Sequence, residues 1–301
     1  MKIAAFPKCF LDIIPEKMTL FAWIEMAQPL GAEGLEMYER FFTSLDDGYI
    51  DSVGEAIHNA GYAMPMLCCS PDFTNPDPDG RKRAVDFEAQ MIRITRRLGG
   101  PRACCRVLSG QRYPEVSVAQ GLQWVVEAIE QLLPVAREYD IVLGLENHFK
   151  DGFWRYPEFA QKKELFLRVL DAIPDRTHFG VQYDPSNAIV AGDDPIDLLR
   201  CVADRVVSMH ASDRYLVPKA TLEELRAEGM LGYSPNLRHG VIGQGLNDYD
   251  QIFSILAGVG YDGWVSIEDG MNGMDEMKTS IDFLKRMRDK HFNSAHHTQV
   301  V

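Results

Sequence analysis

The sequence lacks the features that mark membrane, secreted and zinc-finger proteins. No run of about 18 apolar residues, the length that crosses a bilayer, occurs in its 301 residues. The apolar stretch at the N-terminus is short and stops at Pro7, which predicts a strand rather than a signal peptide. The six cysteines show no Cys-X-X-Cys spacing, and Cys68-Cys69 and Cys104-Cys105 are adjacent pairs that rarely form disulfides with each other. We therefore expect a cytoplasmic protein whose cysteines lie on buried strands.

Positive charge is scarce relative to negative charge. The chain has 31 lysines and arginines against 44 aspartates and glutamates, a formal net charge of −13. A field of this sign repels phosphodiester backbones, so nucleic acid is not expected as a partner. The one dense basic cluster, around Arg81–Arg83, falls on a helical stretch and is interpreted as a solvated helix face.

Short apolar runs alternate with longer amphipathic stretches along the whole chain. The eight runs expected to form strands are Ile3–Phe6, Gly34–Met37, Tyr62–Leu67, Ala103–Leu108, Ile141–Leu145, Phe179–Tyr183, Val206–Met209 and Trp264–Ile267. Near-continuous apolar runs are typical of parallel strands covered on both faces, and strict alternation implies right-handed crossovers. Eight such units in this length favour an α/β protein with a (β/α)₈ TIM barrel over an open sheet.

A single domain is expected over residues 1–290. The turn after the first strand contains no glycine, which argues against a dinucleotide-binding sheet. Residues 291–301 are expected to form a loose C-terminal tail, and its His296-His297 pair is not interpreted as a ligand pair.

Four consecutive strands of the second half each end in a side chain that can bind a metal. These residues are Glu146, Asp184, His210 and Glu268. The C-terminal ends of barrel strands meet at one rim, so the four side chains are expected to converge there. An acidic residue at such a position often only caps the next helix, and Asp184 alone could do that. Three carboxylates and one imidazole suit Mn²⁺ best here, with Mg²⁺ or Co²⁺ as alternatives.

Several motifs resemble the xylose-isomerase-like barrel superfamily, and most closely its sugar-phosphate isomerase/epimerase branch, which includes the ketose 3-epimerases. The motifs are Glu146-Asn147-His148, Asp184-Pro185-Ser186-Asn187, Met209-His210-Ala211-Ser212-Asp213-Arg214, Gly243-Gln244-Gly245 and Ser266-Ile267-Glu268. The resemblance implies one divalent metal ion held by the four strand-end residues. It also implies that Glu146 and Glu268 move protons on opposite faces of a sugar, with Asn187, Arg214 and His239 near the substrate.

A separate base is a second possibility, because a bound cation lowers the pKa of its carboxylate ligands. His148 lies two residues beyond Glu146, so in continued strand geometry both side chains point to the same side. It is therefore a candidate catalytic base, or else a hydrogen-bonding partner of a supporting carboxylate. Glu36 at the end of the second strand could contact substrate or cap a helix. The same two alternatives apply to Lys8 after the first strand.

The segment that follows His148 is long and aromatic, and Trp154 in it could stack on a sugar or a flatter, larger group. It resembles the corresponding segment of the large subunit of bacterial C-glycoside deglycosidases. That resemblance implies action on 3-oxo-C-glycosides and pairing with a small partner subunit. Two assemblies are therefore expected as alternatives, a homo-oligomer or a hetero-oligomer with a small subunit. The alternative is that the aromatic residues only cover the barrel or an oligomer contact.

Three classes of function are therefore compared. The first is metal-dependent proton transfer on a sugar or sugar derivative, as an isomerase, epimerase or carbon–carbon lyase. The second is a repair endonuclease of the AP-endonuclease type, which needs more histidines on strand ends and a basic face. The third is a non-catalytic binding barrel, against which the intact set of four ligands argues.

Overall fold

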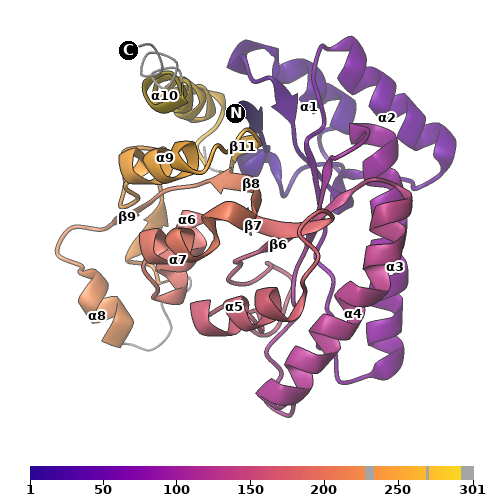
Figure 1. The fold of residues 1–301 in the computed structure, drawn as a ribbon. Coiled ribbons are helices and arrows are strands. Elements are labelled where there is room, and N and C mark those ends of the chain that lie inside the picture. Colours follow the sequence, from indigo (N-terminus) through magenta and orange to yellow (C-terminus); the bar gives the residue numbers. More distant parts are fainter. Residues whose placement is uncertain (228–233, 269–270, 293–301) are drawn as a thin grey trace, which may run out of the picture.

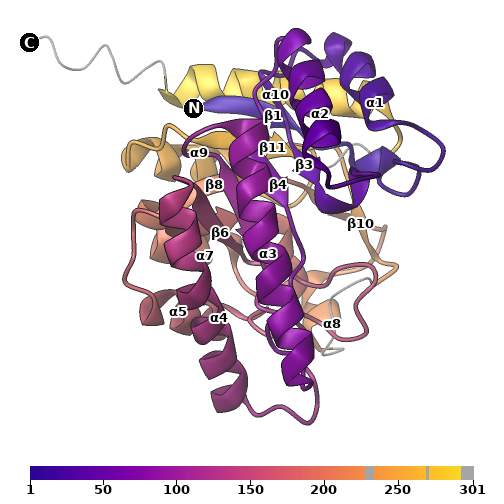
Figure 2. The same cartoon turned by 90° about the vertical axis from the view of Figure 1, so that its right-hand side faces the viewer.

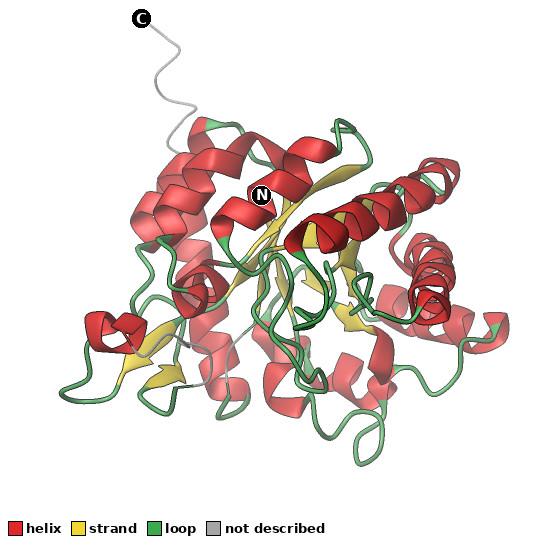
Figure 3. Ribbon diagram, turned by 90° about the horizontal axis from the view of Figure 1, so that it is seen from below, coloured by secondary structure: helices red, strands yellow, loops and turns green. Residues whose placement is uncertain are grey.

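Nine parallel strands, two of them short halves of one predicted strand, form a barrel surrounded by helices in the computed structural model, which describes residues 1–227, 234–268 and 271–292. The main sheet runs in the order β2-β1-β11-β8-β7-β6-β5-β4-β3. Its strands are β1 Lys2–Ala5, β2 Gly34–Leu35, β3 Met37–Tyr38, β4 Met66–Cys68, β5 Cys104–Val107, β6 Val142–Glu146, β7 Phe179–Tyr183, β8 Val206–Ala211 and β11 Trp264–Ile267. Figure 3 shows the helices arranged around these central strands. The predicted (β/α)₈ barrel is confirmed.

Glu36 closes the barrel, because it joins the two ends of the sheet. β2 pairs with β1, β3 pairs with β4, and Glu36 is the single residue between β2 and β3. Its backbone N–H still donates to the carbonyl of Ala5 at 3.0 Å. The predicted second strand therefore exists as two short halves that turn from one neighbour to the other.

Two further details differ from the predicted strands. The third predicted strand, Tyr62–Leu67, is represented by one bridge at Ala63 and then by β4, which starts at Met66. Pro65 lies between them, and proline has no N–H to donate to a strand ladder. The antiparallel pair of β9 (Arg214–Leu216) and β10 (Leu237–His239) was not predicted, because it lies outside the alternating pattern.

The helices bury their apolar stripes against the strands. They are α1 Leu20–Met26, α2 Asp47–Asn59, α3 Pro78–Gly99, α4 Val118–Glu138, α5 Lys163–Ala172, α6 Pro185–Ala191, α7 Pro195–Val202, α8 Leu222–Ala227, α9 Tyr249–Gly258 and α10 Met274–Phe292. Figure 2 shows α3 and α4 lying side by side on one flank. Asp77 caps α3 and Ser117 caps α4 through their side-chain oxygens, which fixes where both helices begin. In the described ranges, no helix combines the length and apolarity that a membrane span requires.

A second, smaller core lies beside the C-terminal end of the barrel. It contains Phe149, Ile189, Val190, Leu225 and Leu237, so it joins the segment after β6 to α6, α8 and β10. Figure 1 shows β9 and α8 projecting together from this side of the barrel. α10 continues to Phe292, two residues past the predicted end of the domain, and residues 293–301, with His296 and His297, lie outside the described residues.

Candidate metal centre

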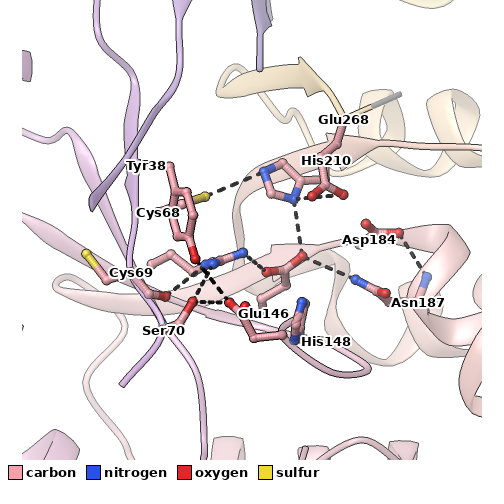
Figure 4. Close-up of polar contacts among 12 residues, drawn as sticks. Tyr38, Cys68, Cys69, Ser70, Glu146, His148, Asp184, Asn187, His210 and Glu268 are labelled. Atoms are coloured by element: carbon pink, nitrogen blue, oxygen red, sulfur yellow. Dashed lines mark hydrogen bonds and ion pairs between the residues drawn. The ribbon is translucent and has the colours of Figure 1, made fainter. Parts of the chain in front are cut away.

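The strand-end residues of β6, β7 and β8 meet in one buried cluster. One ligand atom each of Glu146, Asp184 and His210 lies within 4.8 Å of the others, and all three residues are buried. Oε2 of Glu268, directly after β11, is 3.8 Å from Nδ1 of His210. Figure 4 shows the four side chains pointing toward a common centre. The four residues proposed from the sequence as metal ligands are thus brought together at one rim.

His210 is held between two carboxylates on opposite sides of its ring. Its Nδ1 is 3.1 Å from Oε1 of Glu146, and its Nε2 is 2.7 Å from Oε1 of Glu36. Burial opposes the charged imidazole, but Glu36, Glu268 and Glu146 raise the pKa of His210 above its ordinary value. A carboxylate behind a histidine fixes the orientation and tautomer of the ring, which is the arrangement found behind metal-binding histidines. Glu36 therefore supports His210 and does not face the cavity.

Asp184 both caps α6 and faces the cluster. Its Oδ1 accepts hydrogen bonds from the backbone N–H of Asn187 at 2.9 Å and the hydroxyl of Ser212 at 2.7 Å. Asn147 holds the backbone of Asp184 with a pair of hydrogen bonds, at 2.6 and 2.8 Å. Burial, Glu268 and Glu146 raise the pKa of Asp184 to about 6. Both readings of Asp184 offered by the sequence, as cap and as ligand, are compatible with this geometry.

Arg106 on β5 reaches the cluster from the strand that pairs with β6. Its Nη1 donates to Oε2 of Glu146 at 2.8 Å, and its Nη2 donates to Ser70 at 3.0 Å. Burial alone would raise the pKa of Glu146, but Arg106, His210 and His148 lower it well below its usual range. Arg106 was not predicted as a site residue, although a lone arginine within a predicted buried strand was the available signal.

Lys8 forms an ion pair with Glu268. The distance from Nζ to Oε1 is 2.8 Å, and both side chains are mostly buried. Burial opposes ionisation of Glu268, but Lys8 and His210 lower its pKa to about 2. Lys8 therefore contacts a predicted metal ligand, a role that its position after the first strand did not indicate.

The residues present fit a divalent cation. Burial and, after it, the repulsion from the carboxylates of Glu268 and Glu146 raise the pKa of Asp184, and a bound cation would relieve both. Carboxylate oxygens with one imidazole match the preference of Mn²⁺, Mg²⁺ or Co²⁺, while Zn²⁺ also accepts such a set.

His148 lies at the wall of the adjoining cavity with a carboxylate behind it. Its Nδ1 is 3.2 Å from Oε2 of Glu158, which is fully buried and accepts from the backbone and hydroxyl of Ser109 at 2.8 Å each. Burial opposes a charged His148, but Glu146 and Glu158 raise its pKa. Glu158 was not predicted, because it lies ten residues beyond His148 and no motif marks it.

A cavity of about 230 Å³ opens over the cluster. Its walls include the predicted substrate-binding residues Asn187, Arg214 and His239, together with His148 and Glu268. Nδ2 of Asn187 donates to Oε1 of Glu146 at 3.3 Å, so this side chain joins the cavity to the metal ligands. Burial, Arg214 and Lys8 lower the pKa of His239 to about 3, which leaves a neutral imidazole at the cavity wall.

Trp154 and Glu36 do not line this cavity, although both were predicted to contact substrate. The Trp154 ring is buried and packs edge-on against His148, with ring centroids 6.4 Å apart. Its neighbour Phe153 is the exposed aromatic residue of the segment, at 52% exposure. The aromatic surface therefore lies one residue earlier than predicted, because Trp154 turns inward to support His148.

Comparison with known proteins places these features in a family. The model of the xylose isomerase-like TIM barrel family matches residues 24–287. An inosose dehydratase of Geobacillus kaustophilus is 28% identical over 166 residues, 52% of this chain and 50% of the relative. A 3-oxo-isoapionate decarboxylase of Pectobacterium atrosepticum is 31% identical over 125 residues, 42% of this chain and 38% of the relative. The matched part thus spans half or less of the length of these curated relatives.

A solved structure similar in fold is that of the IOLI protein with a bound zinc atom. It has a TM-score of 0.75 and 17% identity, and the match covers 97% of this chain and 99% of that one. At this identity the likeness concerns the fold.

Proposed function

The chain belongs to the xylose isomerase-like TIM barrel family, and within it we propose a divalent-metal-dependent enzyme that moves a proton beside the carbonyl of a sugar or sugar derivative. The observation that carries the proposal is the position of His148, which faces the cavity beside the cluster of Glu146, Asp184, His210 and Glu268. A bound divalent ion would polarise the substrate carbonyl and stabilise the enediolate. Mn²⁺ is the ion we propose.

His148 is proposed as the base that removes the proton. Glu146 is buried and paired with Arg106, so its pKa is too low for a base near neutral pH. His148 faces the cavity and is oriented by Glu158. Glu268 faces the same cavity from another strand, but Lys8 and His210 lower its pKa to about 2, so by the same criterion it is proposed as a ligand of the ion rather than as a base.

The neutral polar groups of the cavity suit hydroxyl groups of a sugar. Asn187 supplies an amide, and His239 supplies an uncharged imidazole that can donate one hydrogen bond and accept another. Arg214 adds a cation to the wall, which also contains Lys8, Arg106 and Lys150.

Solvent exchange tests the proposal directly. The Mn²⁺-loaded protein would be incubated in D₂O with free ketoses and, separately, with a 3-oxo-C-glycoside. We expect deuterium at the carbon beside the carbonyl for at least one of them, and a loss of about 10²- to 10⁴-fold in His148→Asn. His58→Asn, at an exposed histidine of α2, is the matched control and should exchange like the parent. If the metal-loaded protein exchanges with neither the ketoses nor the 3-oxo-C-glycoside, the proposal is contradicted.

A carbon–carbon lyase acting on 3-oxo-C-glycosides is the second candidate. It is favoured by a second cavity of about 510 Å³, which shares Leu11, Tyr38, Asp151 and Gly152 with the first. Phe153 lines this second cavity, and the guanidinium of Arg40 lies 4.9 Å from its ring centre. The two cavities together offer room for a ring attached to the sugar.

Release of the aglycone separates the two candidates. A lyase would release it from the 3-oxo-C-glycoside, and Phe153→Ala would raise KM for that substrate while leaving KM for a free ketose unchanged. Exchange without release supports the isomerase or epimerase. The oligomeric state remains a prediction, which light scattering of the purified protein would measure. The small partner subunit remains a prediction as well.

A further inference from the structure

A second group of metal-binding side chains lies on the outer face of the barrel. It consists of Cys69, Glu88 and Cys105, and no step of the proposed reaction uses it. One ligand atom of each residue lies within 4.8 Å of the others, and all three residues are completely buried.

The pleat of the strands separates this group from the metal centre. Successive side chains of a strand point to opposite faces, so Cys105 points away from the face on which Arg106 reaches Glu146. Figure 4 shows the sulfur of Cys69 likewise pointing away from the carboxylates of the centre. The group therefore lies between β4, β5 and α3.

Glu88 occupies a position of α3 where an apolar side chain would be expected. It shares the buried stripe of α3 with Met91, Ile92 and Thr95, at helical spacing. Its Oε1 accepts from the thiol of Cys105 at 3.2 Å, while its Oε2 is buried without a hydrogen-bond partner among the described residues. A buried carboxyl oxygen without a partner is destabilising, so a ligand at this place would stabilise the fold.

The separation of the two sulfurs fits a tetrahedral thiolate site. A Zn–S bond of about 2.3 Å in tetrahedral geometry places two sulfurs about 3.8 Å apart. The sulfurs of Cys69 and Cys105 are 4.0 Å apart. Two thiolates with one carboxylate favour a soft, filled-shell cation over the Mn²⁺ or Mg²⁺ that suits the oxygen-rich centre.

We propose that Cys69, Glu88 and Cys105 form a second, structural metal site for a thiophilic ion such as Zn²⁺. The ion ties α3 to β4 and β5, and it gives the buried carboxylate a partner. The two thiols and the carboxyl release their protons to solvent when the ion binds, so occupancy rises with pH. Because the site is buried, the ion is taken up while the chain folds.

Metal analysis and a cobalt spectrum test this site independently of catalysis. Protein produced in zinc-supplemented medium would be analysed as the parent and as Asp184→Asn, which weakens the other centre. We expect about one zinc per chain to persist in Asp184→Asn. Parent protein refolded with Co²⁺ should show a thiolate-to-cobalt charge-transfer band in the near ultraviolet.

Variants assign the ion to these residues. Cys105→Ser and Glu88→Gln should lower zinc occupancy by more than about 10-fold, and Cys105→Ser should remove the cobalt band. Cys201→Ser, at an exposed cysteine, should keep both signals. Cys68→Ser should keep the band as well, because Cys68 contacts Glu36 and His210 instead.

Four results would overturn the site. They are the absence of the cobalt band in the parent, loss of the band in Cys68→Ser, a zinc-free Asp184→Asn protein that is folded, and a Cys69–Cys105 disulfide found by mass spectrometry without reduction. If Cys105→Ser fails to fold, the spectrum of the parent decides.

Discussion

At the scale of single residues, supporting side chains decide what the predicted ones can do. Glu146 matches a motif, but Arg106 makes it a poor base by lowering its pKa. His148 follows Glu146 in the sequence, but Glu158 and Trp154 fix the position of its ring. The motif residues could be predicted because they follow the ends of predicted strands. Their supporting partners come from other elements and carry no local sequence signal.

Glu39 gives a prediction about pH. Burial raises the pKa of its carboxyl to about 7, although a hydrogen bond from Ser70 and the charge of Arg106 oppose this. Between its ordinary value and about 7, the folded state holds a proton that the unfolded state has lost, so stability falls as pH rises through this window. At pH 8, Glu39→Gln should therefore exceed the parent in unfolding free energy by about 1–3 kcal/mol.

Urea unfolding of chelator-treated protein at several pH values checks this expectation. The advantage of Glu39→Gln should vanish as the pH falls below the ordinary value of 4.5, where the carboxyl becomes protonated in both states. Glu55→Gln, at an exposed position of α2, should track the parent at every pH. A constant difference between Glu39→Gln and the parent would show that titration is not its cause.

At the scale of elements, the alternation of strands and helices sets the barrel, and close backbone contacts set its details. Pro65 shortens the third predicted strand, and Glu36 divides the second where the sheet closes. Gly180 in β7 allows β8 to approach, because a Cβ there would lie 2.4 Å from Cγ1 of Val207 and 2.7 Å from the carbonyl oxygen of Arg205. Backbone cannot move aside as a flexible side chain can.

Gly180→Ala should therefore destabilise the protein by about 1–3 kcal/mol, as overpacking in a core does. The measurement is the unfolding free energy in urea, with the metal-free protein as reference. Gly258→Ala, at the exposed end of α9 where a Cβ meets nothing within 4 Å, is the control. It should be neutral or stabilising by up to about 1 kcal/mol. Equal effects of the two substitutions would contradict the packing argument.

At the scale of the whole molecule, the net charge of −13 and the acidic centre both favour cation binding. A ligand that binds only the folded state stabilises it by about 2.7 kcal/mol at 100 times its Kd. Mn²⁺ should accordingly raise the Tm of the chelator-treated protein by roughly 5 °C at that concentration.

Asp184→Asn should lose most of this Mn²⁺-dependent rise, because it removes one of the oxygen ligands. Calorimetry at equal ionic strength, with Na⁺ replacing Mn²⁺, separates specific binding from screening of the net charge. A rise of the same size in Asp184→Asn would place the ion elsewhere on the acidic surface.

The sequence by itself determined the barrel and the four residues at its rim. Apolar strand runs, helical spacing and the residue that ends each run are local properties, and barrel geometry carries strand ends to one place. Tertiary structure alone decided that Arg106, Lys8 and Glu158 support the centre, and that Trp154 turns inward while Phe153 faces solvent. Those contacts join residues from different elements, and their distances depend on how the elements pack, which no local pattern encodes.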